Sequence, residues 1–122
     1  MIMSTAENKI LAMQVYDAIN AQDLTTLETL FDPKIIRHAM GEIGIEPAKQ
    51  AVIAAFAAAP ERRFVVEDLF AERDRVSLRV MLYADAQSAE PQGIILEIFR
   101  FENGRVVEIW GAGGAVKPQP YQ

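Results

Sequence analysis

The spacing of apolar and polar positions changes along the chain from helical to alternating. In residues 4–20 apolar side chains recur near helical spacing, which predicts a helix with a broad apolar face. This segment begins with a capping box, in which Ser4 is the cap and Glu7 follows three residues later. The chain is therefore expected to start with an amphipathic helix.

Two further helices are predicted in the first half of the chain. Asp23 caps a short helix over residues 24–31, which ends because Pro33 disfavours a helical conformation in the residue before it. A third helix covers residues 46–59, with Pro47 in the first turn, where proline is favoured.

After Pro60 the apolar positions alternate, which predicts strands. These strands cover residues 62–72 and 76–84, with a final hairpin over residues 94–111, and one short strand is predicted earlier, over residues 34–41. Helices followed by strands predict an α+β fold, with three helices packed on one face of a strongly curved, mostly antiparallel sheet. Residues 1–122 are expected to form one domain, with an extended tail over residues 115–122.

The turn of the final hairpin allows two registers. A two-residue turn at Asn103 and Gly104 would pair Phe101 with Val106. A three-residue loop would pair Phe101 with Arg105. We favour the three-residue loop, because it gives an apolar inner face and places residue 97 opposite residue 109.

Glu97 is an isolated carboxylate in this hairpin. In both registers Glu97 shares a face with Phe99, because side chains alternate along a strand. The alternative is that Leu96 and Ile98 point inward and Glu97 faces water. Arg100 favours the first arrangement, because it would place a charge on the face of Leu96 and Ile98. Glu97 is therefore expected inside, where burial raises the pKa of a carboxyl group.

Composition and charge exclude several classes of function and partner. The chain has 122 residues, of which 51% are hydrophobic and 24% charged, as in ordinary globular domains. A net charge of −5 argues against nucleic acid and anionic membranes as partners. The chain has no cysteine and one histidine, His38, which excludes thiol chemistry and a histidine-rich metal site. No metal or organic cofactor is expected.

The location is expected to be cytoplasmic. The first residues, MIMSTAENKI, lack the apolar run of a signal peptide, and no stretch of the chain approaches the length of a membrane span.

Four segments together resemble the NTF2-like superfamily, in particular its SnoaL-like polyketide cyclases and ketosteroid isomerases. The segments are VYDAINAQDLTTLETLFDP, IIRHAMG, FVVEDLFAERDRVSLRV and EIFRFENGRVVEIWG, and the resemblance covers about residues 8–112. It implies the cone-shaped fold of that superfamily. It says little about the reaction, because this fold carries enzymes of several kinds and non-enzymatic binding proteins.

The resemblance also implies candidate catalytic residues. Ketosteroid isomerases carry a tyrosine on the first helix four residues before an asparagine, as Tyr16 stands before Asn20 here. They carry an aspartate base after the first strand, where this chain has His38, and a protonated aspartic acid where it has Glu97. SnoaL-like cyclases place their acid/base aspartate at this last position, and often a histidine where this chain has Ile109.

These residues predict an enzyme that acts on a hydrophobic carbonyl compound without a cofactor. His38 would take a proton next to the carbonyl, and Tyr16 and protonated Glu97 would hold the enolate oxygen, giving an isomerisation or an aldol-type cyclisation. The predicted pocket residues are Asn20, Met40, Phe56, Leu82, Phe99 and Ile109.

A purely structural role is open for each catalytic candidate. Glu97 could be satisfied by a hydroxyl or by Arg79, Tyr16 could pack in the core, and His38 could bond to backbone. In that case the domain would be a non-catalytic module that binds a hydrophobic ligand or another protein.

A homodimer is expected through the outer face of the sheet. Trp110, Leu96 and Ile98 would form an apolar patch there, and such patches often mark interfaces.

Overall fold

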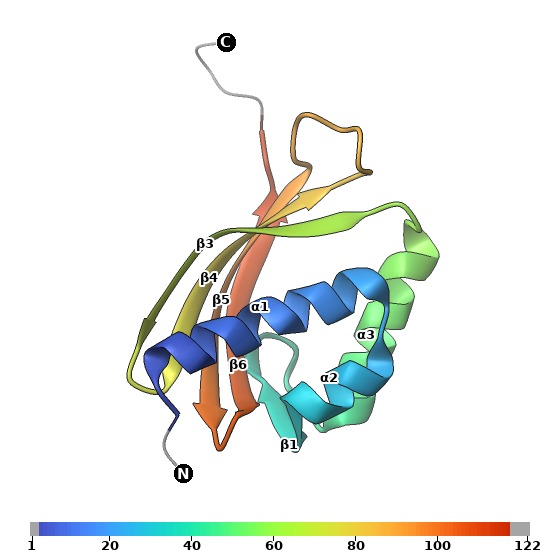
Figure 1. Ribbon diagram of the computed structural model, residues 1–122. Coiled ribbons are helices and arrows are strands. Elements are labelled where there is room, and N and C mark those ends of the chain that lie inside the picture. The colour runs from blue at the N-terminus through green and yellow to red at the C-terminus, as the bar shows by residue number, and fades with distance from the viewer. Residues whose placement is uncertain (1–2, 118–122) are drawn as a thin grey trace.

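The computed structural model describes residues 3–117, in which helices pack on one curved sheet (Figure 1). The helices of this part are α1 (Thr5–Ala21), α2 (Leu24–Leu30), α3 (Ile45–Ala58) and the short 3-10 turn η1 (His38–Met40). The strands are β1 (Phe31–Arg37), β2 (Glu42–Ile43), β3 (Arg63–Glu72), β4 (Arg75–Tyr83), β5 (Gly93–Glu102) and β6 (Arg105–Ala115).

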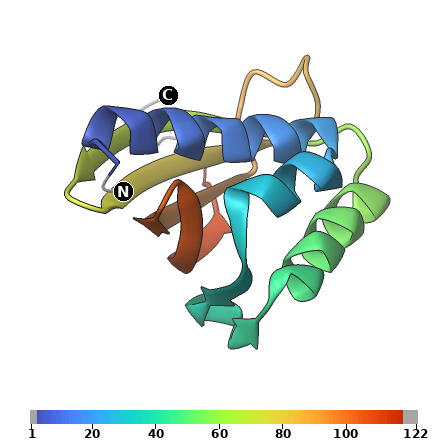
Figure 2. The same cartoon turned by 60° about the horizontal axis from the view of Figure 1, so that its bottom comes forward.

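The sheet has six strands in the order β2-β1-β6-β5-β4-β3, and all neighbours are antiparallel except β1 and β6. α1 crosses the concave side and contacts β3 and β4, while α3 packs beside β1. Figures 1 and 2 show the helices gathered on this one side of the curved sheet. The predicted α+β fold, with three helices on a curved and mostly antiparallel sheet, is confirmed.

α1 places a tyrosine on the inner side of the fold. The Ser4 hydroxyl accepts a hydrogen bond from the Glu7 amide at 3.1 Å, and the Ser4 amide donates to Glu7 Oε1 at 3.0 Å, which completes the predicted capping box. The helix then buries a stripe that includes Ala12, Val15 and Tyr16. Because residues four apart share one face of a helix, Ala12 and Tyr16 both point to the sheet.

Asn20 fixes the end of α1 against the start of β3. Its side-chain nitrogen donates to the carbonyl oxygen of Phe64 at 2.7 Å, and its side-chain oxygen accepts from the amide of Phe64 at 2.9 Å. One side chain thus satisfies both backbone groups of a strand residue at the place where a ladder partner is missing on that side.

The second helix ends one residue earlier than predicted, and the first strand begins three residues earlier. Phe31 has extended backbone angles and is buried, so it belongs to β1 and not to α2. Pro33 lies within β1, where the pairing with β6 is irregular between Phe31 and Ile36. An irregular stretch tolerates proline, because no regular ladder bond is needed from its nitrogen.

The predicted three-residue loop in the final hairpin is wrong. The turn has two residues, Asn103 and Gly104, which both have positive φ, and Phe101 pairs with Val106. Positive φ at both positions is the signature of a type I′ turn, which Asn-Gly favours because it matches the twist of the strands.

A bulge next to this turn changes the rest of the register. The pairing shifts between Arg100 and Phe101, so that Phe99 lies opposite Ile109 and Glu97 lies opposite Gly111. The predicted pairing of Glu97 with Ile109 is therefore also wrong. The bulge preserves the apolar inner face that motivated the three-residue loop, but it does so by adding a residue to β6.

The two faces of β5 differ in solvent exposure, as the alternation of side chains predicts. Leu96 and Ile98 are 54% and 39% exposed, whereas Phe99 is buried. Glu97 therefore shares the inner face with Phe99.

The structure describes only the first residues of the tail predicted over residues 115–122. Ala115 is the last residue of β6 and pairs with Gly93, and the amide of Val116 donates to the Gln92 carbonyl at 3.0 Å. Residues 118–122 lie outside the described residues.

Candidate functional site

A cavity of about 200 Å³ lies between the helices and the inner face of the sheet. Its apolar walls come from α1, α3, β1, β3, β5 and β6. It is lined by Val15, Tyr16, Ile19, Phe31, Arg37, Ala48, Ala51, Val52, Ala55, Phe64, Ile95, Glu97, Phe99 and Ile109. Among these residues only Tyr16, Arg37 and Glu97 carry polar side-chain groups, so the chemistry of the cavity rests on them.

Tyr16 and Glu97 form a pair across the cavity, from α1 to β5. The Tyr16 hydroxyl donates a hydrogen bond to Glu97 Oε1. The ring of Tyr16 lies parallel to Phe99, with 6.3 Å between ring centroids, and inclined to Phe64 at 6.1 Å. These rings leave the phenol little freedom to turn, so its hydroxyl is held at the carboxylate.

Burial sets the ionisation of both groups. It raises the pKa of Glu97, although the Tyr16 hydrogen bond and the charge of Arg37 act in the opposite direction. Burial also raises the pKa of Tyr16 well above its usual value, and the charge of Glu97 adds to the effect. Tyr16 is therefore a neutral donor at physiological pH, and Glu97 gains and releases a proton nearer to neutral pH than an exposed glutamate.

Arg37 is a cavity residue that the sequence analysis missed. It lies at the end of β1, where its Nη1 bonds Glu42 Oε2 at 2.8 Å while the side chain lines the cavity. The strand predicted over residues 34–41 could have revealed it, because side chains alternate along a strand and Arg37 therefore lies on the face opposite Ile36 and His38.

The structure does not bring His38 to the Tyr16–Glu97 pair. His38 lies on the outer face of the sheet, where Nε2 is 2.7 Å from Glu108 Oε2 and its ring stacks on Trp110 at 4.8 Å. Its side chain is 38% exposed. The contact with Glu108 lowers the pKa of that carboxyl group, helped by Arg100, and it ties η1 to β6.

Of the predicted pocket residues, Phe99 and Ile109 line the cavity. Asn20 is not among the lining residues, because its amide is occupied by the Phe64 backbone. Phe56 is buried behind the cavity wall, where it meets the Phe64 ring edge-on at 6.0 Å between centroids.

The two remaining predicted pocket residues lie elsewhere. Leu82 is in β4, paired with Gly93 and away from the lining. Met40 follows the first strand in η1 and is 62% exposed. Arg79, a possible structural partner for Glu97, instead bonds Asp68 at 2.6 Å.

Gly111 leaves room for the Glu97 side chain. A Cβ atom added at Gly111 would lie 3.2 Å from Glu97 Cγ and 3.3 Å from the carbonyl oxygen of Leu96. Because Gly111 is the cross-strand neighbour of Glu97, a side chain there would push against the carboxylate.

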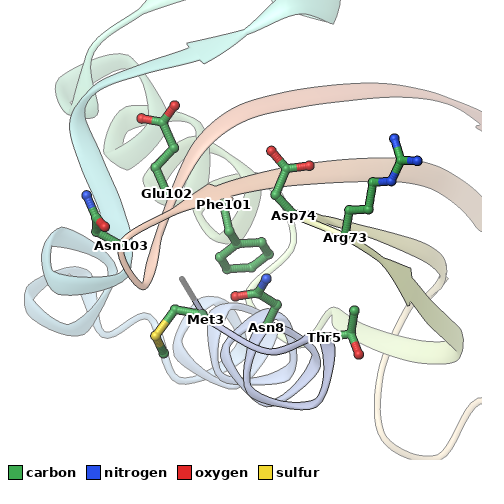
Figure 3. Close-up of a pocket in the computed structure, with 8 residues that line it drawn as sticks. All are labelled: Met3, Thr5, Asn8, Arg73, Asp74, Phe101, Glu102 and Asn103. Atoms are coloured by element: carbon green, nitrogen blue, oxygen red, sulfur yellow. The ribbon is translucent and has the colours of Figure 1, made fainter. Parts of the chain in front are cut away.

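A larger cavity, of about 680 Å³, lies at another place, between the start of α1 and two strand turns (Figure 3). Figure 3 shows Phe101 and Asn8 facing each other, with Arg73 and Asp74 at the rim. Asn8 is buried, and its side-chain oxygen accepts no hydrogen bond from the described residues. We favour the smaller cavity as the functional site, because there a carboxyl group and a phenol meet in apolar surroundings.

Within residues 3–117, no group of three or more histidine, aspartate and glutamate side chains is placed to hold a metal ion. In the same part of the chain, no helix is long and apolar enough to cross a membrane.

Glu97→Gln should change how stability depends on pH. Because the folded pKa of Glu97 lies above its unfolded value of about 4.3, ionisation is harder in the folded protein. As pH rises above the unfolded value, the wild type should therefore lose stability relative to Glu97→Gln, by about 1.4 kcal/mol per unit of pKa difference, and the loss should level off above the folded pKa. Urea unfolding of both proteins between about pH 4 and 8 measures this. A difference that does not vary with pH would contradict it.

Gly111→Ala should destabilise the protein, by about 1–3 kcal/mol, because the added methyl group crowds Glu97 and the Leu96 carbonyl. Gly114→Ala is the matched control in the same strand, since no atom lies within 4 Å of its added Cβ. Urea unfolding compares the two. Equal stabilities for the two variants would show that Glu97 is not confined by its neighbour on β6.

Comparison with known proteins identifies the family and the fold of the chain. A profile of the SnoaL-like polyketide cyclase family matches residues 10–116. No curated protein matches the sequence significantly.

Solved structures show the same fold at low sequence identity. A SnoaL-like polyketide cyclase from Agrobacterium tumefaciens is 19% identical, with a TM-score of 0.75 over 92% of this chain and 93% of that chain. IdmH, a proposed polyketide cyclase from Streptomyces antibioticus, is 21% identical, with a TM-score of 0.74 over 87% and 91%. A proposed ketosteroid isomerase from Kribbella flavida is 16% identical, with a TM-score of 0.73 over 95% and 84%. The family profile covers most of the sequence and the fold agrees, so the chain belongs to the SnoaL-like polyketide cyclase family of the NTF2-like superfamily.

Proposed function

We propose that the protein catalyses a cofactor-independent isomerisation or aldol-type cyclisation of a small hydrophobic carbonyl compound, with Glu97 as acid and base. The observation that carries this proposal is the Tyr16–Glu97 hydrogen bond inside an otherwise apolar cavity. A buried carboxyl group with a raised pKa suits proton transfer near neutral pH, and a neutral phenol suits stabilisation of an oxyanion.

In the first step, ionised Glu97 takes a proton from the carbon next to the substrate carbonyl. The electron pair of the broken C–H bond moves into the C–C bond, and the carbonyl electrons move onto oxygen, which gives an enolate. Protonation removes the negative charge of Glu97, and the negative charge is then on the enolate oxygen. The Tyr16 phenol therefore donates its hydrogen bond to the enolate oxygen instead. The nearby positive charge of Arg37 favours both anionic states.

The second step returns the proton. In an isomerisation, Glu97 gives it to a different carbon of the same enolate, and the double bond ends in a new position. In a cyclisation, the enolate carbon attacks a second carbonyl of the substrate, and Glu97 protonates the alkoxide that forms. Either way Glu97 returns to its ionised form, so no external acid or oxidant is consumed.

This scheme moves the role of the base from His38 to Glu97. His38 was expected to be the base from its place after the first strand, but its side chain lies on the outer face with Glu108 and Trp110. A group on the opposite face of the sheet cannot reach a substrate in the cavity without passing through the strands.

The unconjugated isomer of cyclohexenone is a suitable probe, because its conversion to the conjugated ketone can be followed by absorbance. Glu97→Gln should lower the rate at least about 100-fold, since an amide cannot carry the proton. Tyr16→Phe should lower it about 100- to 1,000-fold by removing an oxyanion donor. His38→Ala is the control and should change the rate less than about 2-fold. Loss of activity in His38→Ala alone would contradict the proposal.

A second function is a non-catalytic module that binds a hydrophobic ligand in the same cavity. The position of His38 favours it, because the cavity then holds a single carboxyl group and no separate base. In that case the wild type would bind the ketone but would neither isomerise it nor exchange its α protons with solvent.

We also propose that the protein is a homodimer through the outer face of the sheet. Phe70, Leu96 and Ile98 are 67%, 54% and 39% exposed there. Together with Trp110 they line an open hollow of about 480 Å³. A two-fold dimer would cover this apolar surface, and it is the commonest assembly of soluble proteins.

Leu96→Glu should convert this dimer into a monomer, because it places a charge in the apolar contact. Ile43→Glu is the matched control, since Ile43 is 71% exposed on β2, away from that hollow. Sedimentation should find the wild type and Ile43→Glu at twice the mass of one chain. A wild type that stays at the mass of one chain at high concentration would refute the dimer.

A further inference from the structure

Arg37 brings a positive charge to a cavity that is otherwise apolar apart from the Tyr16–Glu97 pair. It is the only cation among the residues that line this cavity. Its charge acts on both members of the pair, since it lowers the pKa of Glu97 and of Tyr16. The side chain is partly accessible, at 23%, so it lies between the cavity and the surface.

The guanidinium group of Arg37 has donors to spare. A guanidinium carries five N–H donors in a planar fork. In the described part of the chain its one hydrogen bond goes from Nη1 to Glu42 Oε2, at 2.8 Å. The donors that remain match two oxygen atoms of a carboxylate, which arginine binds in a bidentate way.

The size of the cavity limits what Arg37 can recognise. Pockets for drug-sized ligands measure about 300–1,000 Å³, and this cavity measures about 200 Å³. The side chains of Val52, Phe64 and Ile95 line its apolar sides. A compound with one ring or a short branched chain fits such a space, whereas a compound with several fused rings would protrude from it.

We propose that the substrate is a small apolar carbonyl compound that carries a carboxylate, and that the Arg37 guanidinium binds this carboxylate at the edge of the cavity. The carbonyl then lies against Tyr16 and Glu97, and the apolar body lies against α3 and β5. This inference rests on the proposed function in taking the cavity as the substrate site, but its test measures binding and does not need turnover. Glu42 holds the other side of the guanidinium and so keeps the fork in place.

Two ligands that differ in charge but hardly in shape test the inference, namely cinnamate and cinnamamide. Wild-type protein at neutral pH should bind cinnamate about 10- to 100-fold more tightly than cinnamamide, because charge-assisted hydrogen bonds to a carboxylate are lost with the amide. Amide signals of Ala51, Val52 and Ile95 in NMR spectra should shift on binding, since these residues line the cavity. Shifts confined to the outer face of the sheet would overturn the inference.

Arg37→Gln should remove the preference for cinnamate and leave cinnamamide binding within about 2-fold. Arg37→Lys keeps the charge without the planar fork and should retain only part of the preference. Arg79→Gln is the matched control, because Arg79 also bonds one carboxylate, Asp68, but lies outside the cavity. It should bind both ligands like the wild type. Thermal unfolding of each variant shows whether it is folded. If Arg37→Gln does not fold, the loss of part of the preference in Arg37→Lys tests the carboxylate site instead.

The experiments distinguish failure of the carboxylate site at Arg37 from failure of the proposed acid/base role of Glu97. If cinnamate binds no better than cinnamamide, or if Arg37→Gln keeps the preference, the carboxylate site is wrong even when Glu97→Gln abolishes the isomerisation of cyclohexenone. If the preference depends on Arg37 but Glu97→Gln isomerises as fast as wild type, the carboxylate site stands and the proposed acid/base role does not.

Discussion

The hydrogen bond from the Tyr16 hydroxyl to Glu97 joins the first helix to the sheet inside the cavity, and the surrounding structure makes this pair possible. A carboxylate buried without a partner costs several kcal/mol, or it takes up a proton. The phenol supplies a partner, and the aromatic rings of Phe64 and Phe99 fix where the phenol lies. Gly111 leaves the space that the carboxylate occupies.

The same arrangement connects stability with function. Burial makes the ionised form of Glu97 less favourable, which weakens the fold at neutral pH but moves the pKa toward neutral, the direction that favours the proposed proton transfer. A cavity is also a loss of packing, because its lining side chains lack neighbours on one side. Features that reduce stability without a structural benefit are typical of functional sites. Here two such features, a buried carboxyl group and a cavity, occur together at Glu97.

The sequence predicted the fold from periodicity, and the inward direction of Glu97 from periodicity together with the charge of Arg100. Alternation along β5 is enough to separate Glu97 and Phe99 from Leu96 and Ile98. The register was not predictable in the same way. The two-residue turn was recognisable from Asn103 and Gly104, but nothing in the sequence marks the bulge that follows it.

The candidate site was predictable only in part. Tyr16 and Glu97 were found from alternation and from the family resemblance, and the structure brings them together. His38 was chosen for its chemistry and its place after a strand. Because side chains alternate between the two faces of the sheet, however, Arg37 lies inside and His38 lies outside. Asn20 and Phe56 were expected to face the ligand, but a backbone hydrogen bond and a layer of packing place them behind the cavity wall.

The most direct test of this account is a ¹³C NMR titration of the Glu97 carboxyl group in the wild type and in Tyr16→Phe. The account predicts that Glu97 titrates above its ordinary value of about 4.3 in the wild type. It predicts a higher pKa still in Tyr16→Phe, because the phenol hydrogen bond favours the ionised form. A wild-type pKa at or below the ordinary value, or a pKa that does not rise when the hydroxyl is removed, would contradict the account.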